Sequence, residues 1–166
     1  VYVDADTGFG GVHNVRQAVR AFEKAGVAGM FIGDQVFPNR CGYLPGKEIV
    51  PVDDILSKLA AAVDAKSDPD FFIAARTDAY AIDGLNAAID RANMFLETGV
   101  DMAMAQGADT LEEVERVLKE IPGPHLANQS HAAGKAKTTL DELEAMGYNG
   151  VVFPCFLGER VKVIRI

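Results

Sequence analysis

The chain has 166 residues, of which 49% are hydrophobic, so it can bury a substantial core and is expected to form a single domain over residues 1–166. Its formal net charge of -8 argues against nucleic acid and anionic membrane surfaces as partners. No apolar stretch approaches the ~20 residues that a membrane helix needs, so a soluble, cytoplasmic protein is expected.

Six apolar runs along the chain predict β-strands, because nearly continuous apolar runs are typical of strands buried on both faces. In chain order they are residues 1–6 (VYVDAD), 29–34 (GMFIGD), 71–78 (FFIAARTD), 101–106 (DMAMAQ), 125–128 (HLAN) and 150–155 (GVVFPC).

Amphipathic helix patterns lie between these runs. One predicted helix has an apolar face made of Val15, Ala18, Val19 and Phe22, and another has a face made of Leu111, Val114, Val117 and Leu118. Thr110 with Glu113, and Thr139 with Glu142, have the spacing of capping boxes at helix starts. Glycines that suit left-handed helix ends are Gly26, Gly99 and Gly147.

A strand followed by a helix, repeated at spacings of roughly 25 to 40 residues, predicts right-handed crossovers and a parallel sheet. Six such strands suit a doubly wound open sheet or most of a (β/α)8 TIM-type barrel. The barrel is favoured because no GxGxxG turn follows a strand. Six strands cannot close it, and Val1 already lies in a strand pattern. The chain is therefore expected to cover about six βα units, strands three to eight, of an N-terminally incomplete barrel whose first two units are missing.

Polar residues gather at the carboxyl ends of the predicted strands, where parallel α/β enzymes keep their chemistry. They are Asp4, Asp6, Asp34, Arg76, Asp78, Gln106 and Asn128. A single strand-end Asp or Asn is about as often a cap or a turn residue. Together they favour a shared site.

Asp4 and Asp6 give the strongest indication of a cation site. Residues i and i+2 of a strand point to the same side, and two carboxylates there repel unless a cation or a proton lies between them. Oxygen ligands favour a hard cation, so Mg2+ is expected, held partly through water, with Mn2+ as the other possibility. The histidines, His13, His125 and His131, lack zinc-type spacing.

Cys41 lies in a loop of glycines and prolines, beside Arg40 and within reach of Lys47. Positive charge near a thiol favours the reactive thiolate, and a hinged loop could bring it over the strand ends. A proton donor or acceptor at a carbanion-like centre is therefore expected. The apolar surroundings of Cys155 suit an inert packing residue instead.

Four stretches carry a family resemblance: VDADTGFG, GDQVFPNRCGYLPGK, ARTDA and LAN. In this order and with similar gaps, they resemble the isocitrate lyase and phosphoenolpyruvate mutase superfamily over essentially the whole chain. The cysteine loop looks like that of the methylisocitrate and 2,3-dimethylmalate lyases. Phosphonate mutases lack this cysteine, so the resemblance favours carbon–carbon bond lyases.

The resemblance implies a (β/α)8 barrel, usually a homotetramer that exchanges its last helix, which uses Mg2+ to bind a 2-hydroxy acid or the derived 2-oxo acid. Asp4 and Asp6 match metal-site carboxylates, and Arg76 matches the arginine that holds a substrate carboxylate. Cys41 matches the acid that protonates the carbanion left by cleavage, and Arg40 and Arg76 are the other expected catalytic residues. The remaining expected substrate contacts are Gly42, Gln106 and Asn128.

Four positions depart from the family pattern. Gly33 stands where the family has a metal-shell Glu, and Gln106 stands where it usually has another Glu. Fewer carboxylates should weaken cation binding. Asn39 and Tyr43 replace a Lys and a His, which removes two neighbours that help to activate Cys41.

Three hypotheses follow. The first is a Mg2+-dependent lyase that cleaves a 2-hydroxy di- or tricarboxylic acid of the 2-methylisocitrate or 2,3-dimethylmalate type. The second is a related enzyme, an oxaloacetate hydrolase or a phosphonate-type mutase, although the retained Cys41 disfavours the mutase. The third is a catalytically weakened paralogue that binds a dicarboxylate, which Gly33 and Gln106 favour.

Overall fold

The computed structural model describes residues 1–41, 44–108, 110–128 and 138–153. The chain divides into two compact units, Val1–Gly123 and Pro124–Ile166. The elements of the first unit are β1 (Tyr2–Asp4), α1 (Val12–Lys24), β2 (Gly29–Gly33), α2 (Val52–Ala65), β3 (Phe72–Thr77), α3 (Tyr80–Glu97), β4 (Met102–Ala105) and α4 (Leu111–Glu120). The second unit contains β5 (Leu126–Asn128), α5 (Leu140–Met146) and β6 (Gly150–Val152).

All pairings between these strands are parallel. The first unit holds a four-stranded sheet in the order β1-β2-β3-β4, and β5 pairs with β6 in the second. Sequential strands lie side by side because a helix returns the chain between them. The predicted α/β fold with parallel strands is confirmed. The observed strands are shorter than the predicted runs, and residues 154 and 155 of the last run lie outside the described part.

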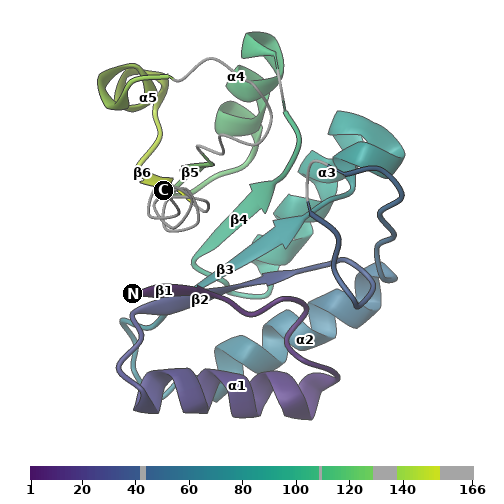
Figure 1. Cartoon of the computed structure of the whole chain (residues 1–166), viewed down its shortest axis with the longest axis vertical. Helices are drawn as coiled ribbons and strands as arrows, with labels where there is room; N and C mark the ends of the chain where they lie inside the picture. The colour runs from purple at the N-terminus through teal and green to yellow at the C-terminus, as the bar shows by residue number, and fades with distance from the viewer. Residues whose placement is uncertain (42–43, 109, 129–137, 154–166) are drawn as a thin grey trace, which may run out of the picture. The chain divides into compact units, whose positions relative to one another are not determined.

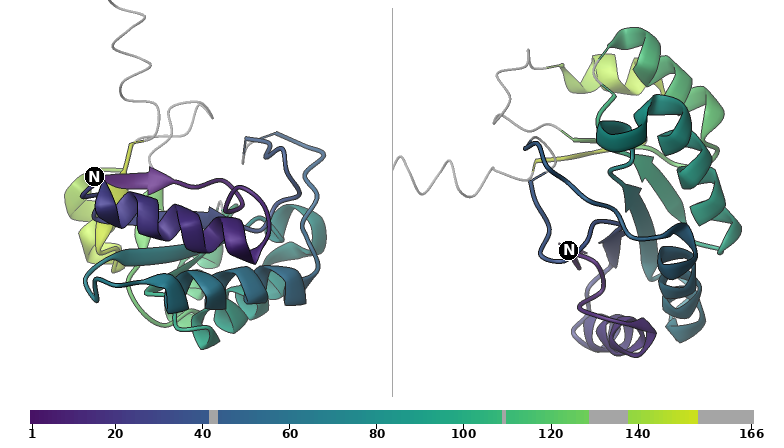
Figure 2. Two further views of the ribbon diagram at one scale, coloured as in Figure 1. Left: turned by 90° about the horizontal axis from the view of Figure 1, so that it is seen from below. Right: turned by 90° about the vertical axis from the view of Figure 1, so that its right-hand side faces the viewer.

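One face of the four-stranded sheet carries the hydrophobic core of the first unit. Figures 1 and 2 show α1, α2 and α3 on this side of the sheet. Alternate strand residues point to it and are fully buried, among them Met30 and Ile32 of β2 and Ile73 and Ala75 of β3. The helices contribute buried residues to the same core, namely Val15, Val19, Leu59, Ala62, Ala92 and Phe95.

Helix ends follow the sequence signals. Thr110 and Thr139 each form the expected capping box, with Glu113 and Glu142 respectively. Gly147 ends α5 in a left-handed conformation with φ of 102°. The prediction for Leu111 was wrong: this residue is 62% exposed, because it opens the first turn of α4 and lies beyond the face that buries Val117. None of the helices in the described ranges is long and apolar enough to cross a membrane.

Gly29 allows β2 and β3 to approach each other closely. A Cβ atom at this position would lie 2.4 Å from the carbonyl oxygen of Phe72, which is far inside van der Waals contact. Gly29 pairs directly with Phe72 in the parallel register. A side chain here would push the two strands apart, so the absence of Cβ helps to set the alignment of β2 on β3.

Asp34 ties the ends of β2 and β3 to α3. Its side chain is fully buried; Oδ2 accepts hydrogen bonds from Thr77 Oγ1 and Arg91 Nε, both at 2.7 Å, and Oδ1 accepts one from the Asp78 amide at 3.0 Å. Arg91 also donates to the carbonyl of Val50, just before α2. The scaffold therefore occupies both oxygens of Asp34, so this strand-end carboxylate serves the fold.

We predict that Arg91→Leu destabilises the fold by about 3–5 kcal/mol, because it leaves the Asp34 carboxylate buried without its cation. Arg116→Leu is the matched control, since it removes an exposed arginine that pairs with Glu120 on α4. That change should cost less than about 1 kcal/mol. Urea unfolding followed by circular dichroism measures both. Equal losses in the two variants would show that the Asp34 pair has no special role.

Candidate active site

The strand register puts Asp4 and Arg76 on the face of the sheet opposite the core. Asp4 is aligned with Phe31, which is aligned with Ala74, so their side chains share this face. Two residues further along β3, Arg76 points the same way and is aligned with Gly33. We call this the inner face. Asp4, Gly33 and Arg76 thus lie along one end of three neighbouring strands.

Asp4 and Asp6 come together through a turn. Asp6 lies beyond β1 in a left-handed conformation, with φ of 48°, and its amide donates to Asp4 Oδ1 at 2.8 Å. The prediction that both carboxylates project from one regular strand was therefore wrong in its geometry. Burial raises the pKa of Asp4 above its ordinary value; the Asp6 amide lowers it, the Asp6 carboxylate raises it, and Arg76 lowers it. Asp4 therefore lies within electrostatic reach of both Asp6 and Arg76.

Asp78 forms a buried ion pair with the Arg76 guanidinium. The Asp78 side chain is only 1% exposed, and its Oδ1 accepts hydrogen bonds from Arg76 Nη2 at 3.0 Å and from Lys47 Nζ at 3.2 Å. Gln35 Nε2 donates to Oδ2 at 3.0 Å. Burial alone would raise the pKa of the Asp78 carboxyl, but Arg76, Gln35 and Lys47 outweigh it and hold the pKa below its ordinary value. This carboxylate is therefore ionised at neutral pH.

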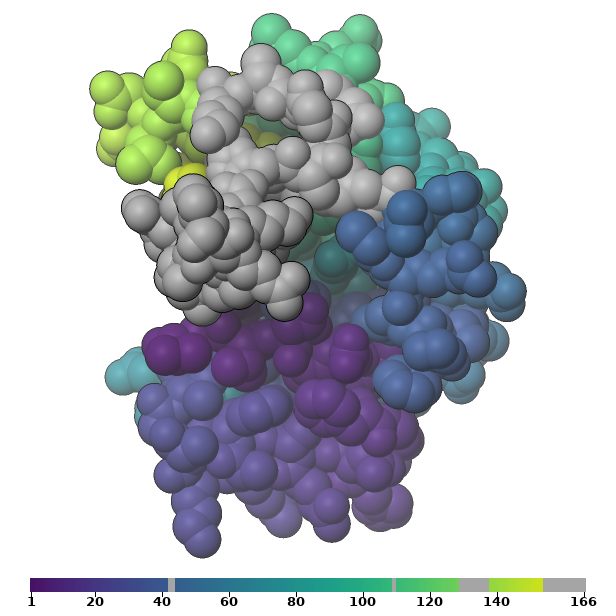
Figure 3. Space-filling view, viewed as in Figure 1, coloured from purple at the N-terminus to yellow at the C-terminus, as the bar shows by residue number. Residues whose placement is uncertain are grey.

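The loop that carries Cys41 is closed at its base. Gln35 pairs with Ile49 in an antiparallel bridge, and the amide of Val36 donates to the carbonyl of Glu48 at 2.8 Å. Residues 36–41 and 44–48, which we call the thiol loop, lie on the blue part of the surface in Figure 3. The base of the thiol loop, formed by Gln35 and Ile49, therefore lies close to the end of β2.

Two further contacts fix the first half of the thiol loop. The Gln35 amide binds both backbone groups of Arg40: Oε1 accepts from its N–H at 2.9 Å, and Nε2 donates to its carbonyl at 3.0 Å. Asn39 Nδ2 donates to Asp6 Oδ1 at 3.3 Å. The residue two positions before Cys41 therefore touches one of the paired carboxylates, and the loop lies at the same end of the sheet as Asp6.

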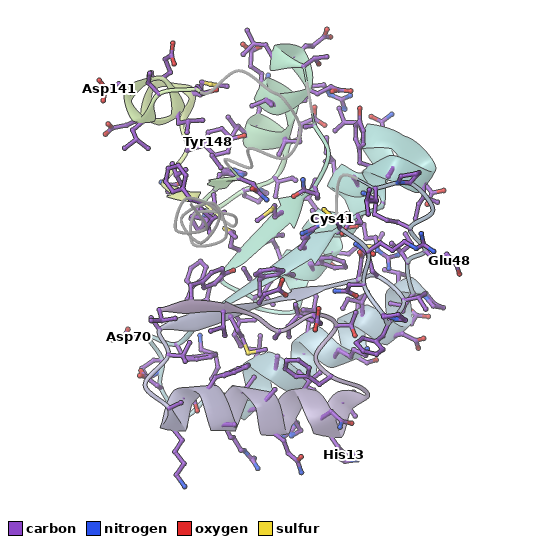
Figure 4. The ribbon with its side chains drawn as sticks, viewed as in Figure 1. His13, Cys41, Glu48, Asp70, Asp141 and Tyr148 are labelled. Carbon is purple, nitrogen blue, oxygen red and sulfur yellow. The ribbon has the colours of Figure 1, made fainter. Side chains whose placement is uncertain are left out.

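Cys41 is exposed and not in a disulfide. Lys47, which the sequence placed within reach of the thiol, instead directs its ammonium group to Asp78 and is only 5% exposed. Figure 4 shows Cys41 near the middle of the view and His13 at the bottom, near the start of α1.

The other expected site residues differ in what the structure describes. Gln106 is half-buried just after β4, and its amide continues the sheet by donating to the Thr77 carbonyl at 2.9 Å. Asn128 ends β5 in the second unit, and its Oδ1 is buried with no hydrogen-bond partner among the described residues. Arg40 is exposed. Gly42 and Tyr43 lie outside the described residues.

Aromatic rings line the inner face next to the carboxylates. Tyr2, two residues before Asp4, stacks at a tilt on Phe31 with ring centroids 6.0 Å apart, and meets Phe72 edge-on at 6.3 Å. Burial and then the Asp4 charge raise the pKa of the Tyr2 hydroxyl, so it stays neutral. A ligand at Asp4 and Arg76 would therefore have ionic groups on one side and an apolar surface on the other.

A family model described as phosphoenolpyruvate phosphomutase matches residues 1–160. The chain belongs to the phosphoenolpyruvate mutase/isocitrate lyase superfamily. It is 42% identical over 154 residues to 2,3-dimethylmalate lyase of Eubacterium barkeri, covering 93% of this chain and 53% of the relative. It is 43% identical over 155 residues to probable 2-methylisocitrate lyase 1 of Corynebacterium glutamicum, covering 93% and 51%. The chain thus spans about half the length of these curated relatives.

Solved structures of superfamily members have the same fold. A crystal structure of 2,3-dimethylmalate lyase matches with a TM-score of 0.92 and 31% identity, over 99% of this chain and 56% of the other. Oxaloacetate acetylhydrolase with 3,3-difluorooxalacetate matches with a TM-score of 0.91 and 32% identity, over 99% and 57%. These neighbours are TIM-barrel-type proteins, in agreement with the barrel-type prediction; this chain covers part of such a structure.

Sequence reasoning missed Gln35 and the actual role of Lys47 in this superfamily member. Asp78 was recognised only as one of several polar strand ends. Gln35 directly follows a predicted strand and precedes the cysteine loop, which was the available signal. What could not be foreseen is that both residues meet at Asp78, 31 and 43 positions further along the chain.

We predict that Asp4→Asn slightly stabilises the chain at pH 7.5, by roughly 1–3 °C in Tm. The folded state raises the pKa of Asp4 above 3.8, so it binds this proton more tightly than the unfolded state does. The ionised carboxylate therefore costs stability as pH rises through that range, and the Asn variant avoids this cost. The advantage should shrink as the pH falls towards 3.8.

Thermal unfolding between pH 4 and 8 measures this difference. Asp70→Asn, which changes an exposed carboxylate, is the control and should shift Tm little at every pH. A lower Tm for Asp4→Asn at pH 7.5 would contradict the assignment of Asp4 as an electrostatically strained group.

Proposed function

We propose that the protein containing this chain is a Mg2+-dependent carbon–carbon bond lyase. It cleaves a 2-hydroxy di- or tricarboxylic acid of the 2-methylisocitrate or 2,3-dimethylmalate type into a 2-oxo acid and a second carboxylic acid. The observation that carries the proposal is the grouping of Asp4, Asp6 and Arg76 at one end of the sheet, with Asn39 of the thiol loop bonded to Asp6. Relatives named as lyases of these two acids support it.

The carboxylates present suit Mg2+, although they are few. Asp4 carries a raised pKa partly because Asp6 lies beside it, and a cation between the two would relieve that repulsion. No cluster of three or more His, Cys, Asp or Glu side chains that could hold a metal exists within the described ranges. Mg2+ commonly uses one or two carboxylates and takes its other ligands from water and substrate. Asp4 and Asp6 would hold it in that way.

Arg76 and Cys41 would carry out substrate binding and proton transfer. Arg76 binds a substrate carboxylate, for which its planar guanidinium is suited, while Asp78 fixes its orientation. Bound Mg2+ would polarise the hydroxyl and carboxylate oxygens of the substrate. A base takes the hydroxyl proton, the C–C bond breaks to give the 2-oxo acid, and the Cys41 thiol gives its proton to the carbanion of the other fragment. The thiolate is then reprotonated.

Two other functions keep specific support. The match to oxaloacetate acetylhydrolase in complex with 3,3-difluorooxalacetate favours hydrolysis of oxaloacetate on the same platform. A weakened dicarboxylate-binding paralogue is favoured by Gly33, which leaves the inner face without a third carboxylate next to Asp6. A phosphonate-type mutase is less favoured because Cys41 is retained.

Catalysis by the complete natural protein tests the proposal. With Mg2+, release of 2-oxo acid should be measured from 2-methylisocitrate, 2,3-dimethylmalate, isocitrate and oxaloacetate. We predict that Cys41→Ser lowers kcat for the preferred substrate by about 10²–10⁴-fold, because the hydroxyl is a much poorer acid. Cys155→Ser is the control and should retain activity. Equal rates for Cys41→Ser and the parent would remove the thiol from the mechanism.

We also predict that Gly33→Glu tightens Mn2+ binding by on the order of tenfold, because it adds a carboxylate to a site that has two. A Cβ at Gly33 would lie 3.4 Å from the Asp6 carbonyl oxygen and 4.0 Å from Asn39 Nδ2, which is ordinary contact, so the variant should fold. Titration of Mn2+ followed by electron paramagnetic resonance measures the Kd. The neutral isostere Gly33→Gln is the matched control, and equal affinity in both variants would argue against a cation next to Asp6.

A homotetramer is part of the proposal for the complete protein, since the resemblance implies it. Size-exclusion chromatography with light scattering measures this state directly.

A further inference from the structure

Asp78 is the only carboxylate in the described ranges that binds both Arg76 and the base of the thiol loop. Its Oδ1 receives Arg76 Nη2 at 3.0 Å and Lys47 Nζ at 3.2 Å, and its Oδ2 receives Gln35 Nε2 at 3.0 Å. Arg76 comes from the inner face of β3. Gln35 and Lys47 come from opposite ends of the thiol loop. One buried anion therefore joins two structural elements that a lyase reaction must use together.

The Gln35 side chain extends this connection towards Cys41. The amide that donates to Asp78 also donates to the Arg40 carbonyl, and its Oε1 accepts from the Arg40 N–H. The backbone immediately before Cys41 is therefore two hydrogen bonds away from Asp78. A change in the position of Asp78 would shift Arg76 and the start of the Cys41 segment together.

Asp78 shares its buried carboxylate between two cations. Asp78 supplies one negative charge, whereas Arg76 and Lys47 supply two positive charges, all on side chains that are no more than 17% exposed. Arg76 Nε is buried and has no hydrogen-bond partner in the described part of the chain. A ligand carboxylate at Arg76 would supply an acceptor for this N–H. Without the Asp78 carboxylate, Arg76 and Lys47 would both lose the buried anion that they share.

We propose that Asp78 is a positioning residue that fixes the orientation of Arg76 and anchors the two ends of the thiol loop at the same time. The part that concerns substrate rests on the proposed function; the hold on the loop does not. Asp78 acts through Arg76, Lys47 and Gln35, and its carboxylate lies behind the guanidinium.

Hydrogen–deuterium exchange tests the hold on the loop without any need for catalysis. In Asp78→Asn, the side chain keeps its size but loses its charge and one acceptor oxygen. Peptides covering residues 35–49 should exchange about tenfold faster than in the parent, while peptides from α1 and α2 should be unchanged. Asp70→Asn, at an exposed aspartate, is the matched control and should leave loop exchange at the parent rate.

A second variant keeps the test decisive if Asp78→Asn does not fold. Gln35→Leu leaves the Asp78 pairs with Arg76 and Lys47 in place but cuts the link to Arg40. It should accelerate exchange in the same 35–49 peptides. If both folded variants, or Gln35→Leu alone when the other does not fold, exchange like the parent in these peptides, the proposal is overturned.

Kinetics on the preferred substrate then separate positioning from general destabilisation. Asp78→Asn should raise KM about tenfold through Arg76 and also lower kcat, whereas Gln35→Leu should lower kcat with little change in KM. A purely structural role would lower the active fraction in both variants and leave KM at the parent value, which would overturn the link to Arg76. If the parent turns over none of the four acids but loop exchange still responds, the hold on the loop is supported and only the proposed lyase function fails.

Discussion

The parallel register of β1, β2 and β3 decides which side chains can meet, because successive residues of a strand point to opposite faces. A slip of one residue would send Arg76 into the helix-covered core and bring Ala75 or Thr77 to the inner face. Gly29, packed against the Phe72 carbonyl, and the Asp34 network at the other end of β2 both support this alignment. The grouping of charged residues on the inner face depends on these apolar and buried polar contacts.

Two buried carboxylates close to each other serve different purposes. Asp34 accepts from a hydroxyl, an amide and Arg91, so its charge is balanced within the scaffold. Asp78, whose amide donates to Asp34, instead faces two cations. The Asp34–Arg91 pair also restrains Asp78, because the Asp34 side chain accepts a hydrogen bond from the Asp78 backbone amide. Rigid support of this kind keeps the Arg76 guanidinium in place for an acidic ligand.

Local patterns in the sequence were enough to predict the elements and most of their ends. The apolar runs, the capping boxes at Thr110 and Thr139 and the glycine after α5 act over a few residues, so they are visible without knowledge of the fold. The convergence of strand-end polar residues was expected from the parallel architecture, whereas the shared face of Arg76 and Asp4 depends on the register between the strands. The prediction that Leu111 is buried was wrong because helical periodicity gives the apolar face of a helix but not how far along that face the packing extends.

The details of the candidate site depend on contacts between distant segments, and these could not be predicted. The turn at Asp6 requires a positive φ that an aspartate rarely adopts, so a regular strand was the natural expectation. Lys47 was expected to act on a nearby thiol, but the buried charge of Asp78 is the stronger attraction. Pairs of side chains that are 31 or more positions apart in the sequence can be identified only once the tertiary structure is known.

The hydrogen bond from Asn39 to Asp6 makes the thiol loop and the carboxylate pair thermodynamically linked. A group that takes the place of Asn39 at that oxygen of Asp6 would release the loop contact, and loss of the contact would free one acceptor site on the oxygen. By reciprocity, the two events change each other's equilibrium by the same factor. An asparagine at this position therefore couples the placement of the arm that bears the sulfhydryl group to the hydrogen bonding of one acidic side chain at the sheet edge.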